Sequence, residues 1–126
     1  MKILIIENET LVRVGICTIL RGEKDFEIVG DAQTIDEGFR LFREKRPDVT
    51  LMSLRLHEAC AVDEIGNFLA FAPRAKIIIL ASRAGDAEIS RALQGGAYGY
   101  ILRDISESEL VKAIRTVAAG KKYIPN

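Results

Sequence analysis

The chain has very little of several features that define whole classes of protein. Its 126 residues include only two cysteines, Cys17 and Cys60, which form neither a CxxC pair nor a metal-ligand spacing. We interpret both as reduced thiols. No apolar run approaches the roughly 20 residues that a membrane-spanning helix needs, and the short run at the start lacks a signal-peptide pattern. We therefore expect a cytoplasmic protein with no membrane partner.

The chain also carries no net charge. Its 18 basic and 18 acidic residues balance at pH 7, so overall charge attracts neither a phosphate backbone nor an anionic membrane. We do not expect this chain to bind DNA by itself. Its composition, 48% hydrophobic and 29% charged, and its length are those of a single globular domain.

Motifs for nucleotide binding and covalent catalysis are missing as well. Neither GxGxxG nor GxxxxGK[ST] occurs. The only histidine, His57, stands beside Glu58 and four residues after Ser53, so a Ser–His–Glu triad can be sketched. Ser53 has no GxSxG elbow, however, and adjacent His and Glu side chains rarely face each other. We interpret His57 as a solvated loop residue and expect no enzymatic activity.

Five short apolar runs alternate with five segments of helical periodicity. The predicted strands are Ile3–Ile6, Phe26–Val29, Val49–Met52, Ile77–Leu80 and Tyr98–Leu102. The predicted helices are Thr10–Leu20, Asp36–Arg46, Val62–Ala72, Asp86–Gln94 and Glu107–Ala119. Several runs are apolar on both faces, which is typical of parallel strands covered by helices on each side. The alternation predicts a doubly wound α/β domain.

Start signals support three of the helices. Thr34 and Ser106 each precede a glutamate by three residues, Glu37 and Glu109, which is the spacing of a capping box. Asp86 is expected to cap the helix that ends before Gly95-Gly96. The segment from 62 to 72 has no clear cap.

In a doubly wound sheet, ligands bind beyond the carboxyl ends of the strands. The polar or functional residues expected at those ends are Glu7, Asn8, Glu9, Ser53, Ala81, Ser82, Arg83, Arg103 and Asp104. We expect this edge of the sheet to carry any site.

Four segments, in order, resemble the receiver domain of bacterial response regulators, particularly the NarL/FixJ (LuxR-type) subfamily. They read ILIIENETLVR at 3–13, RPDVTLMSLRL at 46–56, ALQGGAYGYILRD at 92–104 and AAGKKY at 118–123. The resemblance covers essentially the whole chain. It implies a flavodoxin-like, five-stranded parallel sheet of strand order 2-1-3-4-5 with five helices. Residues 1–120 would form the receiver-like domain, and 121–126 a tail or the start of a linker to an effector domain.

The resemblance also implies a site, and this sequence departs from it. In the family, two acids and an aspartate hold Mg²⁺, the aspartate accepts a phosphoryl group, and a Thr/Ser and a Lys bind the phosphoryl oxygens. At these positions this chain has Glu7 and Asn8 for the acids, Ser53 for the phosphoacceptor, Ala81 followed by Ser82 for the Thr/Ser switch, and Arg103 for the lysine. Tyr100 stands at the aromatic position that reports the state of the switch.

These departures predict a domain that works without phosphorylation. A serine hydroxyl stays protonated near neutral pH and is a weak nucleophile without a base. We expect no Mg²⁺, with Glu7 the one weak candidate ligand and Glu9 able to reach the pocket. Arg103 is expected to point toward Glu7 or to bond near Ser53. Tyr100 either holds one fixed rotamer or merely packs.

The apolar pattern of the first and last helices adds a candidate interface. Leu110, Ile114 and Val117 follow the spacing of a core-facing stripe, whereas Val111 and Ala118 lie off it. The first helix is apolar on more than one face: Leu11, Val12, Val14, Ile16, Cys17, Ile19 and Leu20. This surplus predicts a homodimer through these helices, the alternative being an apolar but monomeric pair.

The leading functional hypothesis is an atypical receiver in two-component signal transduction. It acts through protein contacts, with a sensor kinase or another regulator as partner, and controls an attached helix-turn-helix DNA-binding domain. Two alternatives stay open. One is a stand-alone interaction module, and the other is a sensor that binds an anion or small molecule in the vacated pocket through Ser53, His57, Arg83 and Arg103.

Overall fold

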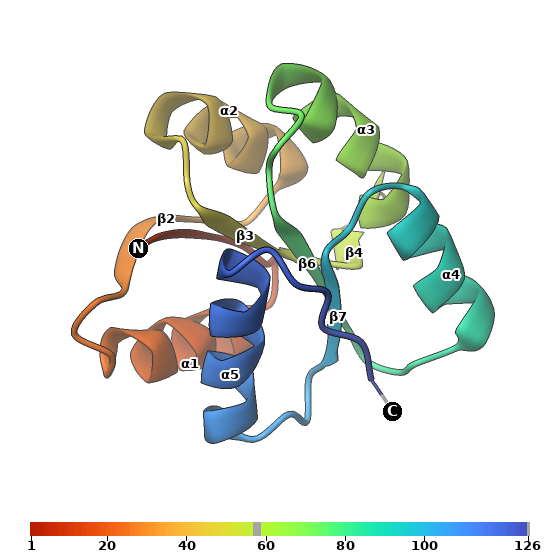
Figure 1. The fold of residues 1–126 in the computed structure, drawn as a ribbon. Coiled ribbons are helices and arrows are strands. Elements are labelled where there is room, and N and C mark those ends of the chain that lie inside the picture. The colour runs from red at the N-terminus through yellow and green to blue at the C-terminus, as the bar shows by residue number, and fades with distance from the viewer. Residues whose placement is uncertain (57–58, 126) are drawn as a thin grey trace.

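The computed structural model describes residues 1–56 and 59–125. A parallel sheet of five strands lies at its centre, in the order β2-β1-β3-β6-β7 (Figure 1). The strands are β1 (Lys2–Ile6), β2 (Glu27–Ala32), β3 (Val49–Ser53), β6 (Ile77–Ala81) and β7 (Gly99–Leu102). This confirms the predicted flavodoxin-like strand order.

Helices cover both faces of the sheet. They are α1 (Thr10–Arg21), α2 (Ile35–Lys45), α3 (Ala61–Phe71), α4 (Asp86–Gln94) and α5 (Glu107–Ala118). Figure 1 shows α1 and α5 on one face and α2, α3 and α4 on the other. None of the helices in residues 1–56 and 59–125 combines the length and apolar character needed to cross a membrane.

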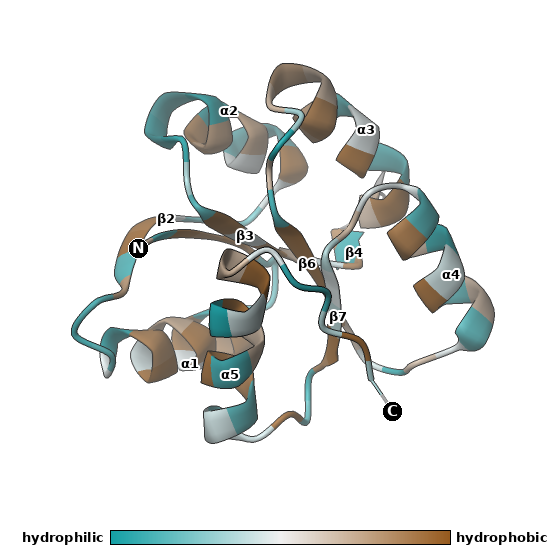
Figure 2. Ribbon diagram, viewed as in Figure 1, coloured by the Kyte–Doolittle hydropathy of each residue, from teal (hydrophilic) through white to brown (hydrophobic). Residues whose placement is uncertain are grey.

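Alternate residues of each central strand supply opposite cores. Ile77 and Ile79 of β6 pack with α2, α3 and α4 in one cluster, while Ile78 and Leu80 pack with α1 and α5 in the other. Both faces are therefore buried, which explains why the strands read as continuous apolar runs. Figure 2 shows this hydrophobic character along β3 and β6.

Two of the three predicted helix caps are present. The backbone N–H of Glu37 donates to Thr34 Oγ1 at 3.2 Å, and that of Glu109 donates to Ser106 Oγ at 3.2 Å. The predicted cap at Asp86 is wrong: Gly85 is the N-cap, Asp86 is already helical, and α4 has no side-chain cap bond. As a first-turn residue, Asp86 instead places a negative charge near the positive end of the helix dipole.

The structure adds short elements that the sequence pattern missed. An antiparallel pair, β4 (Arg55–Leu56) with β5 (Ala59–Cys60), follows β3. Two residues are too few for an alternating pattern to be read. The expected tail also meets the sheet, because Tyr123 bridges Gly99 and its N–H donates to the carbonyl of Tyr98 at 3.0 Å.

Candidate functional site

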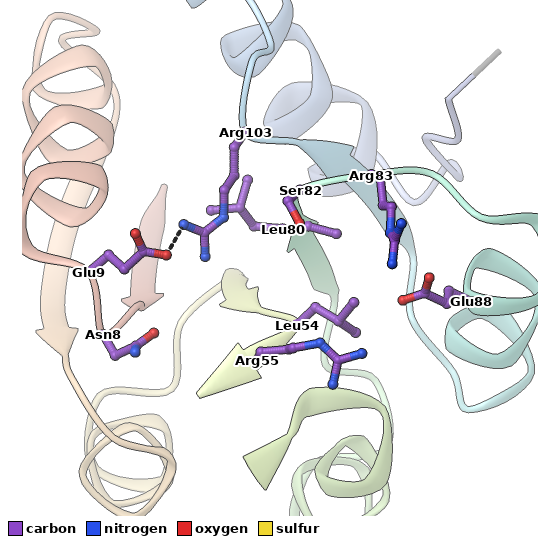
Figure 3. Close-up of a pocket in the computed structure, with 10 residues that line it drawn as sticks. Asn8, Glu9, Leu54, Arg55, Leu80, Ser82, Arg83, Glu88 and Arg103 are labelled. Carbon is purple, nitrogen blue, oxygen red and sulfur yellow. Dashed lines mark hydrogen bonds and ion pairs between the residues drawn. The ribbon is translucent and has the colours of Figure 1, made fainter. Parts of the chain in front are cut away.

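The carboxyl ends of β1, β3, β6 and β7 surround a cavity of about 350 Å³. It is lined by Asn8, Glu9, Leu54, Arg55, Leu80, Ala81, Ser82, Arg83, Glu88 and Arg103. Figure 3 shows Asn8, Glu9 and Arg103 on one side of it, with Arg55, Arg83 and Glu88 toward the other. The structure thus brings together most of the residues that the sequence placed at these strand ends.

Glu7 is the buried anion behind this cavity, with no exposed surface. Its Oε2 accepts the backbone N–H of Glu9 at 2.9 Å. The side-chain amide of Asn8, oriented to suit its neighbours, donates to the same oxygen at 3.0 Å and to the carbonyl of Arg55 at 3.2 Å. Arg13, buried on α1, donates to the backbone carbonyl of Glu7 at 3.0 Å. Backbone and side chain of Glu7 are both held by neighbouring donors.

Arg103 supplies the countercharge. Its Nη2 lies 3.1 Å from Oε1 of Glu7 and donates to Ser53 Oγ at 3.0 Å, while its Nη1 pairs with the carboxylate of Glu9. The contact with Glu7 is an ion pair without hydrogen-bond alignment, because Oε1 has no hydrogen-bond partner among the described residues. The predicted orientation of Arg103 toward Glu7 and Ser53 is confirmed.

Glu7, Glu9 and Arg103 form a charged cluster, and the other predicted site residues lie around it. Ser53 is buried and its hydroxyl also approaches the carbonyl of Arg55 at 3.5 Å. Ala81 is buried and has no hydroxyl, whereas Ser82 lines the cavity. Tyr100 has no exposed surface, and its Oη donates to the carbonyl of Arg83 at 3.0 Å. The ring is therefore packed, and its hydroxyl is held as a donor. Burial also raises the pKa of the Tyr100 phenol.

The residues present fit Mg²⁺ poorly. Mg²⁺ requires several oxygen ligands in octahedral geometry, with carboxylates supplying the charge. Here Oε2 of Glu7 is already occupied by donors and Oε1 faces a guanidinium at 3.1 Å. Ser53 offers a neutral hydroxyl. In residues 1–56 and 59–125, no three His, Cys, Asp or Glu side chains are grouped to hold a metal ion.

Arg55 and Glu88 are cavity residues that the sequence analysis missed. Arg55 begins β4 after a bend at Leu54, so strand periodicity did not carry over from Ser53 to place it at the cavity. Glu88 is in the first turn of α4, where no sequence signal indicated the cavity. The three arginines around the cavity, Arg55, Arg83 and Arg103, are matched by the carboxylates of Glu7, Glu9 and Glu88. Because positive and negative side chains are equal in number, the cavity has little electrostatic preference for an anion.

Of the Ser53–His57–Glu58 arrangement that the sequence allowed to be sketched, His57 and Glu58 lie outside the described residues. Among the described residues, Ser53 donates toward the carbonyl of Arg55 and accepts from Arg103. Neither contact is with a base that could activate the hydroxyl.

Comparisons with known proteins agree with this architecture. Residues 3–115 match the family described as the response regulator receiver domain. The chain is 34% identical over 122 residues to the transcriptional regulatory protein MctR of Rhizobium johnstonii, covering 97% of this chain and 57% of that protein. It is 31% identical over 124 residues to the transcriptional regulatory protein LnrK of Bacillus subtilis, covering 98% and 56%. The chain therefore spans just over half the length of these relatives.

Solved structures have the same fold. A two-component response regulator of the LuxR family from Aurantimonas superposes with a TM-score of 0.92 at 27% identity, over 97% of this chain and 87% of that one. The isolated REC domain of RcsB from Salmonella enterica serovar Typhimurium gives a TM-score of 0.89 at 21% identity, over 100% of this chain and 94% of that one. At that lower identity the second match supports the fold alone.

Proposed function

This chain belongs to the response regulator receiver domain family, and on that premise we propose that it signals through protein contacts without accepting a phosphoryl group. The observation that carries the proposal is Arg103, whose guanidinium contacts Glu7, Ser53 and Glu9 together. We further propose that the domain uses no cofactor and catalyses no reaction.

Electrostatics explain why the cluster opposes phosphorylation. A buried carboxylate is stable only when it is paired, and Arg103 provides that pairing permanently because a guanidinium does not lose its proton in proteins. A cation arriving at Glu7 would have to displace Arg103 or lie beside it. Among the described residues, Ser53 contacts no base that could remove its proton.

The direct test is addition of beryllofluoride and Mg²⁺, followed by amide NMR of the chain. We expect no saturable shifts at Ser53, Tyr100 or Arg103, whereas a receiver with an intact aspartate, measured in parallel, responds. Mg²⁺-dependent, saturable shifts at these three amides would show that the pocket still accepts a phosphoryl mimic and would end the proposal.

We also propose that the domain forms a homodimer through α1 and α5. Leu11 and Val14 on α1 are 88% and 55% exposed, and Val111 on α5 is half-buried. Between the helices runs a groove of about 190 Å³, lined mainly by apolar side chains. Arg103 lines this groove as well as the cavity, so the charged cluster is in contact with the proposed interface.

The proposal for partners and output is based on the relatives. LnrK and MctR are transcriptional regulatory proteins that are nearly twice as long as the region they share with this chain. We propose that this domain regulates a helix-turn-helix DNA-binding domain and receives its signal from a sensor kinase or another regulator that docks without phosphotransfer. The test is DNA binding by the complete gene product, with and without a substitution in the α1–α5 interface. Equal binding by both would contradict regulation through this surface.

A further inference from the structure

The central sheet has two outer edges, one at β2 and one at β7. The N–H and C=O groups on the outer side of an edge strand are a template on which another chain can pair. At β2 the exposed charged side chains of Glu27 and Asp31 discourage such pairing. The four residues of β7, Gly99–Leu102, include no charged side chain. The β7 edge therefore lacks the protection that β2 has.

Residues 121–125, which we call the edge segment, lie along the outer side of β7 (Figure 1). The backbone N–H of Tyr123 donates to the carbonyl of Tyr98 at 3.0 Å, and that of Tyr100 donates to the carbonyl of Tyr123 at 3.0 Å. These two bonds flank Gly99, the residue that Tyr123 bridges in parallel orientation. An extended chain thus fits at this edge, and the edge segment occupies the position.

The end of α5 directs the edge segment toward β7. The backbone N–H of Gly120 donates to the carbonyl of Val117 at 2.9 Å, and that of Lys121 donates to the carbonyl of Thr116 at 3.1 Å. Together these bonds form a Schellman motif. The φ of Gly120 is 87°, a left-handed conformation that glycine adopts without strain. The helix end therefore fixes the direction in which the edge segment leaves α5.

Two side chains of the edge segment also bind the domain. The Oη of Tyr123 donates to Oε2 of Glu109 on α5 at 2.5 Å. The Nζ of Lys122 donates to the carbonyl of Ala97 at 3.3 Å and lies 4.6 Å from the centre of the Tyr98 ring, a cation–π distance. The segment is therefore held by its backbone and by side chains on both sides of the bridged residue pair.

The edge segment contains residue types that stop further strand pairing. Lys121 and Lys122 are exposed, and lysine on an edge strand is a common means of preventing another strand from adding. In a parallel ladder, the next donor to β7 after Tyr123 is two residues on, at Pro125, which has no N–H. The segment therefore covers part of the β7 edge without offering a regular edge of its own.

We propose that the edge segment prevents β7 from pairing with β7 of a second copy. The two strands are identical and uncharged, so once uncovered they meet antiparallel about a two-fold axis, with the same residues on both sides of the contact. With the segment docked, association is left to other surfaces. This inference does not depend on the proposed function, because it concerns the β7 edge and not the charged cluster or the exposed face of α1.

The test is Tyr123→Pro in the whole chain, made in a Val14→Asp background that disrupts the proposed α1–α5 contact. The proline removes the N–H that donates to Tyr98 and the phenol that donates to Glu109. By sedimentation equilibrium, we expect the double variant to self-associate with a dissociation constant at least about tenfold lower than that of Val14→Asp. Equal sedimentation of the two would overturn the proposal. Association of Val14→Asp itself would count only against the α1–α5 dimer.

Hydrogen exchange locates the contact. At concentrations where the double variant is monomeric, the Tyr100 amide should exchange at least about tenfold faster than in Val14→Asp, because its acceptor on Tyr123 has left. Its protection should return as the variant associates. The Arg103 amide, which donates to the carbonyl of Ala81 at 2.9 Å, should stay protected throughout and so report an intact sheet. Association that leaves the Tyr100 amide exchanging rapidly would place the contact elsewhere and contradict the proposal.

A second pair of substitutions tests the pairing-resistant residues while the edge segment stays docked. Lys121→Val with Pro125→Val keeps Tyr123 and should promote association through the segment, with the Tyr100 amide still protected. Lys24→Val with Pro73→Val replaces one exposed lysine and one exposed proline outside the strands and should not promote association. Equal association of the two double variants, or none in either, would show that Lys121 and Pro125 do not protect this edge.

Discussion

Nη2 of Arg103, just after β7, lies 3.1 Å from Oε1 of Glu7, just after β1. The two residues are 96 positions apart in the sequence, and β3 and β6 separate their strands in the sheet. Glu7 is fully buried, while 23% of the Arg103 side chain remains exposed. A single guanidinium thus neutralises the buried charge and links two strands that do not pair directly.

The pair predicts a specific pattern of stability. Arg103→Ala leaves the carboxylate of Glu7 buried without its countercharge, and we expect unfolding free energy to fall by about 2–3 kcal/mol, less than for a fully buried pair because Arg103 is partly solvated. Adding Glu7→Gln to Arg103→Ala should recover part of this loss. Chemical denaturation of the two single variants and the double variant measures the coupling.

Arg83→Ala provides the matched control. Arg83 lines the same cavity and is exposed, and it forms no ion pair among the described residues, so its loss should change stability by less than about 0.5 kcal/mol. A double variant that is less stable than Arg103→Ala alone would contradict the role of Arg103 as countercharge.

Restoring the phosphoacceptor alone should not restore phosphorylation. Nη2 of Arg103 donates to Ser53 Oγ at 3.0 Å, so in Ser53→Asp the new carboxylate would stand beside this guanidinium. The resulting ion pair lowers the nucleophilicity of the carboxylate and keeps a metal ion away from it. We expect no labelling by acetyl phosphate in intact-protein mass spectrometry. The combined variant Asn8→Asp, Ser53→Asp, Ala81→Thr and Arg103→Lys should be labelled. Rapid labelling of Ser53→Asp by itself would be the contrary result.

The proposed dimer predicts a change in oligomeric state. Val14→Asp places a charge on an exposed apolar position of α1, where burial against a second copy would be costly, and it should shift sedimentation toward the monomer. Ile124→Asp, a comparable change at a residue that is 44% exposed in the tail, should have no effect. Identical sedimentation of the unmodified chain and Val14→Asp would count against the α1–α5 interface.

Close packing of α2 on β1 depends on Gly38. A Cβ at this position would lie 2.5 Å from Cδ1 and 2.8 Å from Cγ1 of Ile6, so Gly38→Ala forces the buried Ile6 side chain or the helix to shift and should cost about 1–3 kcal/mol. Gly66→Ala on α3 meets nothing within 4 Å and should stabilise the chain by about 0.5–1 kcal/mol. Thermal or chemical unfolding measures both, and equal effects of the two substitutions would show that contact with Ile6 is unimportant.

Tyr123 anchors the C-terminal segment in a pH-dependent way. Its Oη donates to Oε2 of Glu109 at 2.5 Å, and this bond, with some burial, raises the phenol pKa from 10.0 to about 12. The bond therefore contributes to stability below pH 10, and the contribution disappears as pH rises from 10 to 12. Ultraviolet titration should detect late titration of Tyr123 as well as of the buried Tyr100, and Glu109→Gln should return only the Tyr123 pKa toward 10. Unchanged titration in that variant would exclude the bond as the cause.

Much of this fold could be predicted from local pattern. The apolar runs of β3 and β6, buried on both faces, identified parallel strands, and Thr34 with Glu37 and Ser106 with Glu109 identified two helix starts. These signals are readable because each depends on residues close together in the chain. The Asp86 prediction was wrong for a related reason: a carboxylate favours both the N-cap and the first turn, so residue type alone does not fix the boundary.

The sequence by itself determined which residues stand at the carboxyl ends of the strands, and with them that Arg103 and Glu7 share one edge of the sheet. Only the tertiary structure decided that Nη2 of Arg103 contacts both Glu7 and Ser53, and that Arg55 and Glu88 complete the cavity. Strand periodicity specifies toward which face of the sheet each side chain points and whether it is buried. Contacts between side chains from separate loops depend instead on how the helices pack on the sheet, which no local pattern encodes.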